Sequence, residues 1–310
     1  MFIQTVSTEN VQTPDQGGSD IKSAILSTIA YSDVFDCPLT IRELCRYLIA
    51  YQTGESSLQK VLKNGGLIPR TLSTDGKYLA LAGREEIFAL RRKRAMEAAT
   101  LWPRSLRYGK LIAQLPFIRM VAVTGALASD NVDLGSDLDY LIVTAPGWLW
   151  LCRAMILALD RIAVGVSLCP NFLLTENSLA LQDRDLFAAQ EMARMVPISG
   201  FHVYLKMRAQ NRWTDNFLPN ARGAPRNFGE PPPINRSLQK FGETLLGNRA
   251  ARRLETWEMR RKIEKFSRQE KMNGETCFSA DYCKGHFDGH KQRTMQAFHG
   301  RIENLGLNGQ

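Results

Sequence analysis

The chain contains 310 residues, of which 44% are hydrophobic and 23% are charged. This composition is typical of a globular protein with a large core, and it excludes a largely disordered chain or one built mainly of membrane spans. The formal net charge of +9 favours polyanionic partners, which include nucleotides, nucleic acids and acidic surfaces. The length predicts two or three domains.

A targeting segment and a membrane span are both unexpected in this sequence. Residues 1–19 are polar and carry little positive charge, so we expect a flexible tail rather than a signal peptide. The most apolar stretch, residues 147–168, contains Arg153, Asp160 and Arg161, and is better explained as a helix packed on a sheet. Six scattered cysteines show no disulfide framework. We therefore expect a cytoplasmic protein without membrane contact.

Residues 20–83 are expected to form three helices followed by a hairpin. Isoleucines recur every four residues at the start, Thr40 and Glu43 have the spacing of a capping box, and an Asp-Gly turn separates two short apolar runs. This order of elements resembles a winged helix-turn-helix domain. The second and third helices are predicted over residues 41–51 and 56–63, and the apolar runs over residues 67–72 and 77–81.

In a winged helix, residues 56–63 would occupy the position of the DNA-recognition helix. Their only basic residues are Lys60 and Lys63, which are few for a helix that must neutralise DNA phosphates. A protein-docking or dimerising module is therefore favoured over a DNA-binding one.

Residues 84–116 are expected to form a long, basic helical connector that is interrupted at Pro103. It contains the basic run 91–94, and Trp102 and Tyr108 are interleaved with further basic residues. Stacking and charge together could follow a nucleic-acid strand, yet a basic run on a helix is more often a solvated face. Nucleic acid is thus an open but not a favoured partner.

The most informative stretch, residues 120–144, predicts two strands joined by a glycine-containing turn. A buried strand ends before Gly125, and a second apolar run begins at Leu138. Because strand side chains alternate, Asp137 and Asp139 should share one face, with their Cα atoms roughly 6–7 Å apart. Two carboxylates held this close require a cation, and their hard oxygen atoms suit magnesium bound together with a phosphate.

This arrangement, a glycine after one strand and an acid-x-acid pair opening the next, resembles the signature of the DNA polymerase β-like nucleotidyltransferase superfamily. The resemblance covers residues 117–213 and implies an α/β fold whose mixed sheet carries helices on one side. It also implies transfer of a nucleoside monophosphate from an NTP to an acceptor hydroxyl, with two magnesium or manganese ions. The residues that it places in the site are Asp137 and Asp139 as catalytic metal ligands, and Gly125, Ala126, Ser136 and Asn171 as nucleotide-binding residues.

Two positions depart from the family pattern. The residue after the glycine is usually Gly or Ser, whereas Ala126 keeps a backbone N–H for phosphate but has no hydroxyl. A third carboxylate is usual on a later strand, whereas the candidate strand 168–175 offers Asn171, which can ligate a hard cation but is a poor general base. These departures leave open an alternative function: a nucleotide-binding regulator with weakened catalysis and the winged helix as its output or docking module.

Beyond the central motif, helices are expected over residues 148–164 and 186–195. In the superfamily, helices after the third strand often supply polar groups to the triphosphate or the base. Lys206, Asn211 and Arg212 are candidates for this role by position alone, and ordinary surface positions explain them equally well.

The C-terminal part begins with residues 214–236, which are rich in Pro, Gly and Asn and predict a linker. Residues 237–310 predict a basic helical region. Within it, Cys283, His286 and His290 could supply zinc ligands. The paired cysteine spacing of structural zinc sites is missing, however, so capping or docking roles are favoured.

Overall fold

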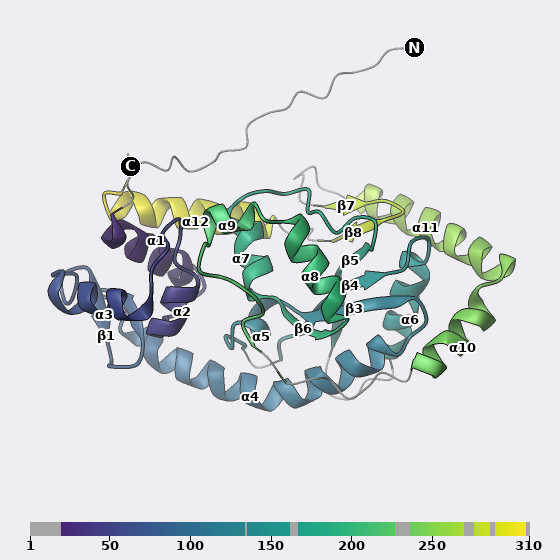
Figure 1. Ribbon diagram of the computed structural model, residues 1–310, viewed down its shortest axis with the longest axis horizontal. Helices are drawn as coiled ribbons and strands as arrows, with labels where there is room; N and C mark the ends of the chain where they lie inside the picture. Colours follow the sequence, from purple (N-terminus) through teal and green to yellow (C-terminus); the bar gives the residue numbers. More distant parts are fainter. Residues whose placement is uncertain are drawn as a thin grey trace, which may run out of the picture.

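The computed structural model describes residues 20–133, 135–161, 167–226, 228, 236–269, 276–285 and 289–307. The expected flexible tail, residues 1–19, lies outside this range. The described residues form an N-terminal helical unit, a central sheet covered by helices, and a C-terminal segment that contacts both (Figure 1).

The N-terminal unit consists of three helices and a short hairpin, in the order that the sequence predicts. Its elements are α1 (Ile21–Asp33), α2 (Ile41–Arg46), α3 (Glu55–Asn64), β1 (Leu72–Thr74) and β2 (Leu79–Leu81). The predicted capping box at the start of α2 is confirmed, because the Glu43 N–H donates to the Thr40 hydroxyl at 3.2 Å and the Thr40 N–H donates to the Glu43 carboxylate at 2.8 Å. The helix is shorter than the expected 41–51, since the backbone leaves the α-helical region at Tyr47.

The helix α4 (Glu86–Ala113) is the longest of the described helices and runs from the N-terminal unit along the sheet (Figure 1). The sequence predicts an interruption at Pro103, and this prediction is wrong, because the helix continues through the proline. On either side of it, Trp102 and Ser105 are buried against the sheet region. The Trp102 indole also donates to Asp130 at 2.7 Å. Tertiary contacts on this face therefore hold the helix together where proline removes one backbone hydrogen bond.

The central sheet is mixed, as the resemblance implied. Its strands are β3 (Ile118–Val123), β4 (Leu138–Thr144), β5 (Leu168–Thr175), β6 (Val196–Ser199), β7 (Cys277–Phe278) and β8 (Tyr282–Lys284). They lie in the order β6-β3-β4-β5-β8-β7. Only β4 and β5 are parallel among these described strands, and the other neighbouring pairs are antiparallel. The glycine-containing turn lies between β3 and β4, in the middle of the sheet.

Helices cover both faces of this sheet, whereas the resemblance implied helices on one side. Besides α4, they are α6 (Leu149–Asp160), α7 (Leu186–Arg194), α8 (Phe201–Gln210) and α11 (Arg249–Gln269). One face, with Tyr140 and Ile142, packs against α4, α6 and α11, and the other, with Leu141 and Val143, packs against α7 and α8. Both faces need a cover because β4 is apolar on both sides.

The C-terminal region also differs from the expected helical region, because it contains a hairpin and returns to the start of the chain. Its remaining elements are α10 (Arg236–Leu246), the β7–β8 hairpin and α12 (His290–Asn304). β8 pairs with β5 and so extends the central sheet. α12 lies beside α1 (Figure 1), where the Arg301 guanidinium contacts the Asp33 carboxylate at 2.6 Å. The two ends of the described chain therefore pack together.

Part of the expected linker is packed rather than extended. The short helix α9 (Thr214–Phe217) and the buried Leu218 and Ala221 pack with α2 and α7. Arg46 donates to the Arg222 carbonyl at 3.0 Å. The proline-rich residues 229–235 lie outside the described residues. Among the helices that the structure describes, none combines the length and apolarity needed to traverse a bilayer.

Candidate functional site

The turn after β3 brings Gly125 and Asp139 into contact. Gly125 begins the short helix α5 (Gly125–Ala128) with a φ of +65°, a conformation that favours glycine. A Cβ atom at this position would overlap Oδ2 of Asp139 and lie 3.2 Å from its Cγ. The Thr124 N–H donates to the Asp139 carbonyl at 3.0 Å. The carboxylate is therefore held directly against the bend that the sequence singles out.

Asp137 lies at the same edge of the sheet but is exposed, just before β4 begins. Burial, followed by the negative charges of Asp139 and Asp137, raises the pKa of the Cys169 thiol to about 11. Both carboxylates therefore lie near this thiol. The Ser136 hydroxyl donates to the Asp133 carbonyl at 2.8 Å and closes the turn before β4.

Asn171 lies in β5, at an irregularity of the strand pairing. Asp139 pairs with Cys169, whereas Leu141 pairs with Phe172, so two residues of β5 oppose one residue of β4. The side chain of Asn171 lies outside the described residues. The described neighbour of Asp139 on β5 is thus a cysteine and not a carboxylate.

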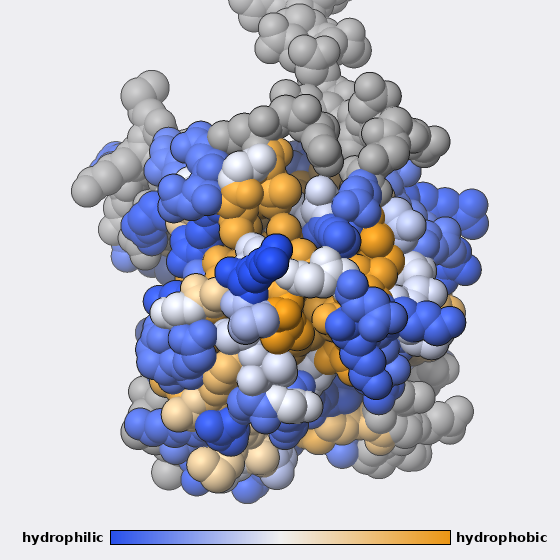
Figure 2. Space-filling model, turned by 90° about the vertical axis from the view of Figure 1, so that its left-hand side faces the viewer, coloured by the Kyte–Doolittle hydropathy of each residue, from blue (hydrophilic) through white to orange (hydrophobic). Residues whose placement is uncertain are grey.

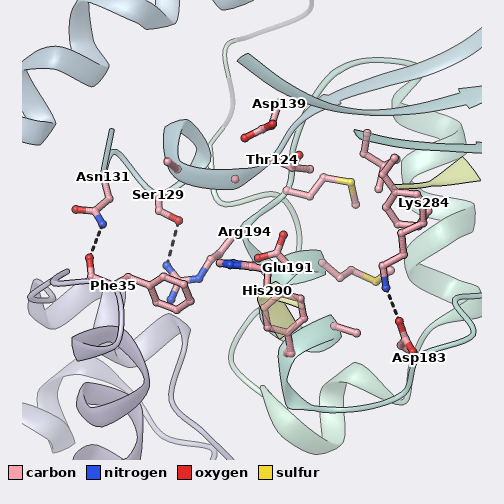
Figure 3. A pocket seen from close by; sticks show the side chains of 18 of the residues that line it. Phe35, Thr124, Ser129, Asn131, Asp139, Asp183, Glu191, Arg194, Lys284 and His290 are labelled. Carbon is pink, nitrogen blue, oxygen red and sulfur yellow. Dashed lines mark hydrogen bonds and ion pairs between the residues drawn. The ribbon is translucent and has the colours of Figure 1, made fainter. Parts of the chain in front are cut away.

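Gly125, Ala126 and Asp139 line a cavity of about 440 Å³ between the sheet, the N-terminal unit and α7 (Figure 3). We call its upper side in Figure 3 the roof, formed by Thr124, Gly125, Ala126 and Asp139. We call the opposite side the floor, formed by Glu191, Arg194 and His290. Asp137 and Ser136 are not among the lining residues, so the predicted site residues divide between the cavity and its outer edge.

The floor carries an acidic group without a partner. Glu191 makes no side-chain hydrogen bond or ion pair with any residue that the structure describes, and its side chain is exposed to the cavity although protein surrounds it. Burial raises the pKa of its carboxyl group, and the opposing positive charges of Arg194, His290 and Lys284 do not cancel this effect. A carboxyl group in this setting is available to a ligand.

The cationic side chains of the cavity have partners. Arg194 contacts the Ser129 hydroxyl at 3.3 Å and lies over the Tyr47 ring at 4.2 Å. Lys284 donates to Asp183, whose carboxyl group is also 3.2 Å from the Lys291 ammonium. Although burial raises the pKa of Asp183, these two ammonium groups hold it below its ordinary value.

Two arginines of the basic run of α4, Arg91 and Arg94, face inward, and Arg91 supports the roof. The buried Arg91 donates to the carbonyls of Ser129 and Asp130 at 2.7 and 2.6 Å, and to Glu43 at 2.7 Å. Arg94 holds both carboxylate oxygens of Asp133. In the same run, Arg92 pairs with Asp75. These arginines connect α4, the N-terminal unit and the loop after α5, and they do not form an open track for a nucleic-acid strand.

The end of the molecule formed by the N-terminal unit and α12 presents a mixed surface. Hydrophilic residues surround a central strip of hydrophobic ones on this side (Figure 2). On α3, Lys60 and Lys63 are exposed together with Glu55. The exposed charges of α3 are therefore of both signs, and docking and DNA binding both stay predictions.

The remaining candidates do not join the cavity. Lys206 and Arg212 are exposed, and neither lines it. Asn211 is fully buried, and its amide holds the Leu181 N–H at 2.8 Å and the Leu179 carbonyl at 2.7 Å, which is a structural role.

The structure does not bring the possible zinc ligands together. Cys283 packs in the core on the α6 face of the sheet, whereas His290 lines the cavity on the α7 face. His286 lies outside the described residues. Within the described ranges, no group of three or more His, Cys, Asp or Glu residues is arranged to hold a metal ion.

Sequence reasoning did not find the floor. Glu191 lies within the amphipathic helix α7, where neighbouring Ala189 and Met192 are buried, and His290 is distant in sequence. No short motif joins these positions, and only the packing of α12 near α7 could have identified them. The chain matches no protein-family model, no curated protein and no solved structure.

Proposed function

We propose that this chain is a metal-dependent nucleotidyltransferase that uses the roof of the cavity. The observation that carries the proposal is the Asp139 carboxylate, which lies against the positive-φ bend at Gly125 and lines a cavity of about 440 Å³. A cavity of this size falls in the range of small-molecule sites. Arg91 holds the loop that follows the bend, through the carbonyls of Ser129 and Asp130.

The donor set at the roof is compatible with a hard divalent ion. Asp139 is the second residue of β4 and Asp137 directly precedes the strand, so both carboxylates belong to the same end of β4. Magnesium is commonly bound by one or two carboxylates, with substrate phosphates and water completing its ligands. Asp139 would hold the ion from the cavity side and Asp137 from the solvent side. When bound, the ion would neutralise charge on the phosphates.

The roof also offers backbone donors to the phosphates. The first N–H groups of a helix have no partner within it, and Thr124 provides no side-chain cap to α5. Ala126 can therefore contribute its backbone N–H, and it needs no side chain for this contact.

In the reaction, an acceptor oxygen forms a bond to the α-phosphorus while the bond between the α-phosphorus and the oxygen that bridges to the β-phosphate breaks. Pyrophosphate leaves, and the acceptor proton passes to a base or to water.

The test is incubation of the purified full chain with each α-labelled NTP, magnesium or manganese, and a panel of hydroxyl-bearing acceptors. We expect label transfer and pyrophosphate release that depend on the metal and are abolished by Asp139→Ala. If the folded protein binds NTP tightly but never converts it, the proposed enzymatic activity is contradicted.

A nucleotide-binding regulator is the second candidate, and two observations favour it. The described neighbour of Asp139 on β5 is Cys169 instead of a third carboxylate. The N-terminal unit, through Tyr31, Phe35 and Cys37, forms part of the cavity wall. A bound nucleotide would therefore contact the winged-helix-like unit directly. NTP binding that changes amide exchange in α1 without turnover would support this function.

A further inference from the structure

Glu191 is a carboxyl group that lines the cavity and makes no side-chain hydrogen bond or ion pair with the described residues. It projects from α7 toward the cavity, on the side opposite to Asp139 (Figure 3). None of the described residues donates a hydrogen bond to its carboxylate or forms an ion pair with it. Because its side chain is exposed to the cavity, this carboxylate keeps water as its partner while the cavity is empty and can exchange that water for a ligand cation or hydrogen-bond donor. No structural role of Glu191 in the described chain explains this arrangement.

Aromatic rings surround the same part of the cavity. The His290 ring lies 6.2 Å from the Phe35 ring and 5.8 Å from the Phe187 ring, measured between centroids. Tyr31 lines the cavity beside them. Faces of aromatic rings attract organic cations, and this attraction is strongest where water is excluded. The cavity thus combines the carboxylate on its floor with aromatic rings in its wall.

The neighbouring cations act on this carboxylate through space but make no hydrogen bond or ion pair with it. Arg194 is the nearest on the same helix, but its guanidinium contacts Gln190 and Ser129 and stacks over Tyr47. Lys284 is bonded to Asp183. The other basic side chain of the cavity, Arg94, is bonded to Asp133.

We propose that the floor binds the ammonium group of a small organic cation, with Glu191 as its counter-ion and the rings of Phe35, Phe187 and Tyr31 around it. Because the floor faces the roof across one cavity, the same molecule would present a hydroxyl group to the α-phosphate. This second part rests on the proposed function and names its acceptor class: a small hydroxylated amine or quaternary ammonium compound.

The first experiment is isothermal titration calorimetry of the full chain without nucleotide or metal. The probes are choline, ethanolamine and 3,3-dimethylbutan-1-ol, which has the shape of choline without its charge. We expect saturable binding of at least one of the two cations. The uncharged isostere should bind about tenfold more weakly than choline or not at all, because it forfeits both the ion pair and the cation–π contacts. Failure of both cations to bind, or equal binding of choline and the isostere, would overturn the proposal.

Variants then locate the site. Glu191→Gln keeps the shape of the side chain and should weaken binding of the cation at least about tenfold, whereas Phe187→Leu should weaken it less. Glu303→Gln removes the same charge from an exposed position on α12 and should bind as wild type. Wild-type affinity in Glu191→Gln, with folding checked by its thermal transition, would refute the assignment.

The outcomes separate this inference from the proposed function. If cations bind through Glu191 but no NTP is turned over with any acceptor, the cavity is a cation site and the nucleotidyltransferase proposal fails. If label is transferred efficiently to acceptors without an ammonium group and Glu191→Gln transfers it equally well, the enzyme stands and the cation site is refuted.

Discussion

The roof and the floor of the cavity are built in different ways. The roof comes from one stretch, residues 118–144, in which a strand, a bend and a second strand follow each other. The floor combines Glu191 and Arg194 of α7 with His290 at the start of α12. Local geometry thus positions the roof, whereas the floor exists only because the C-terminal helix packs back on the N-terminal unit.

A second difference concerns how the charged groups are satisfied. At the roof, the loop after Gly125 is held by Arg91 and the turn before Asp139 is closed by Ser136. At the floor, Glu191 has no partner among the described residues. The loops of the roof are thus tied to α4 and to the turn before β4 by hydrogen bonds, whereas the floor presents a carboxylate without such bonds.

The largest expected effect comes from removing the roof carboxylate. Asp139→Ala should lower nucleotidyl transfer by about 10³-fold, since metal ligation is worth several kcal/mol to such a reaction. Asp137→Ala should lower it less, because Asp137 is exposed and lies outside the cavity lining. Pyrophosphate release at saturating NTP measures both, and equal activity of Asp139→Ala and wild type would remove the roof from the mechanism.

The next effect tests the bend itself. Gly125→Ala combines an unfavourable φ with a collision at Asp139, and we expect a loss of activity together with a destabilisation of about 1–3 kcal/mol. Gly66→Ala is the matched control, since Gly66 has a φ of +71° and open space at its Cβ position. Gly66→Ala should lower the free energy of unfolding by only about 1 kcal/mol, the cost of a left-handed backbone conformation for alanine. Denaturant titration compares the two variants, and equal costs would show that contact with Asp139 is unimportant.

The third prediction asks how far the roof depends on the N-terminal unit. Arg91→Met would leave the carbonyls of Ser129 and Asp130 without their donor and Glu43 without its ion pair. We expect a loss of about 3–5 kcal/mol in the free energy of unfolding, the range for breaking a buried charged pair. The KM for NTP should rise in protein that remains folded. Arg92→Met, at an exposed position of the same helix, should change stability by about 1 kcal/mol or less.

The smallest effect concerns the floor and its pH dependence. Burial raises the pKa of Glu191 in the folded protein above its ordinary 4.5. The folded protein therefore holds this proton more tightly than the unfolded chain does. Its contribution to the free energy of unfolding is full below the unfolded pKa and is lost as the pH rises through the folded pKa. Glu191→Gln should therefore unfold at a temperature equal to or above that of wild type at pH 7, and the advantage should shrink toward pH 4.5. Thermal scans across this range measure it. A variant that is less stable at pH 7 would reveal a structural partner for the carboxylate.

Prediction from the sequence succeeded where neighbours in the chain are neighbours in space. The order of three helices and a hairpin, the Thr40–Glu43 capping box and the alternation along β4 all follow from local periodicity and turn chemistry. The continuity of α4 through Pro103 could not be predicted in this way, because contacts with the sheet region outweigh the local cost of proline.

The sequence by itself determined the element that positions Asp139, because a glycine bend and an alternating strand are properties of consecutive residues. Only the tertiary structure decided that Asp139 would face Glu191 across a cavity, that Arg91 and Arg94 of α4 would turn inward, and that helices would cover both faces of the sheet. These features depend on packing between segments far apart in the chain, and the burial that drives such packing is non-directional. The apolar pattern of the sequence thus predicts which side chains become buried, whereas the tertiary fold determines which polar groups come into contact.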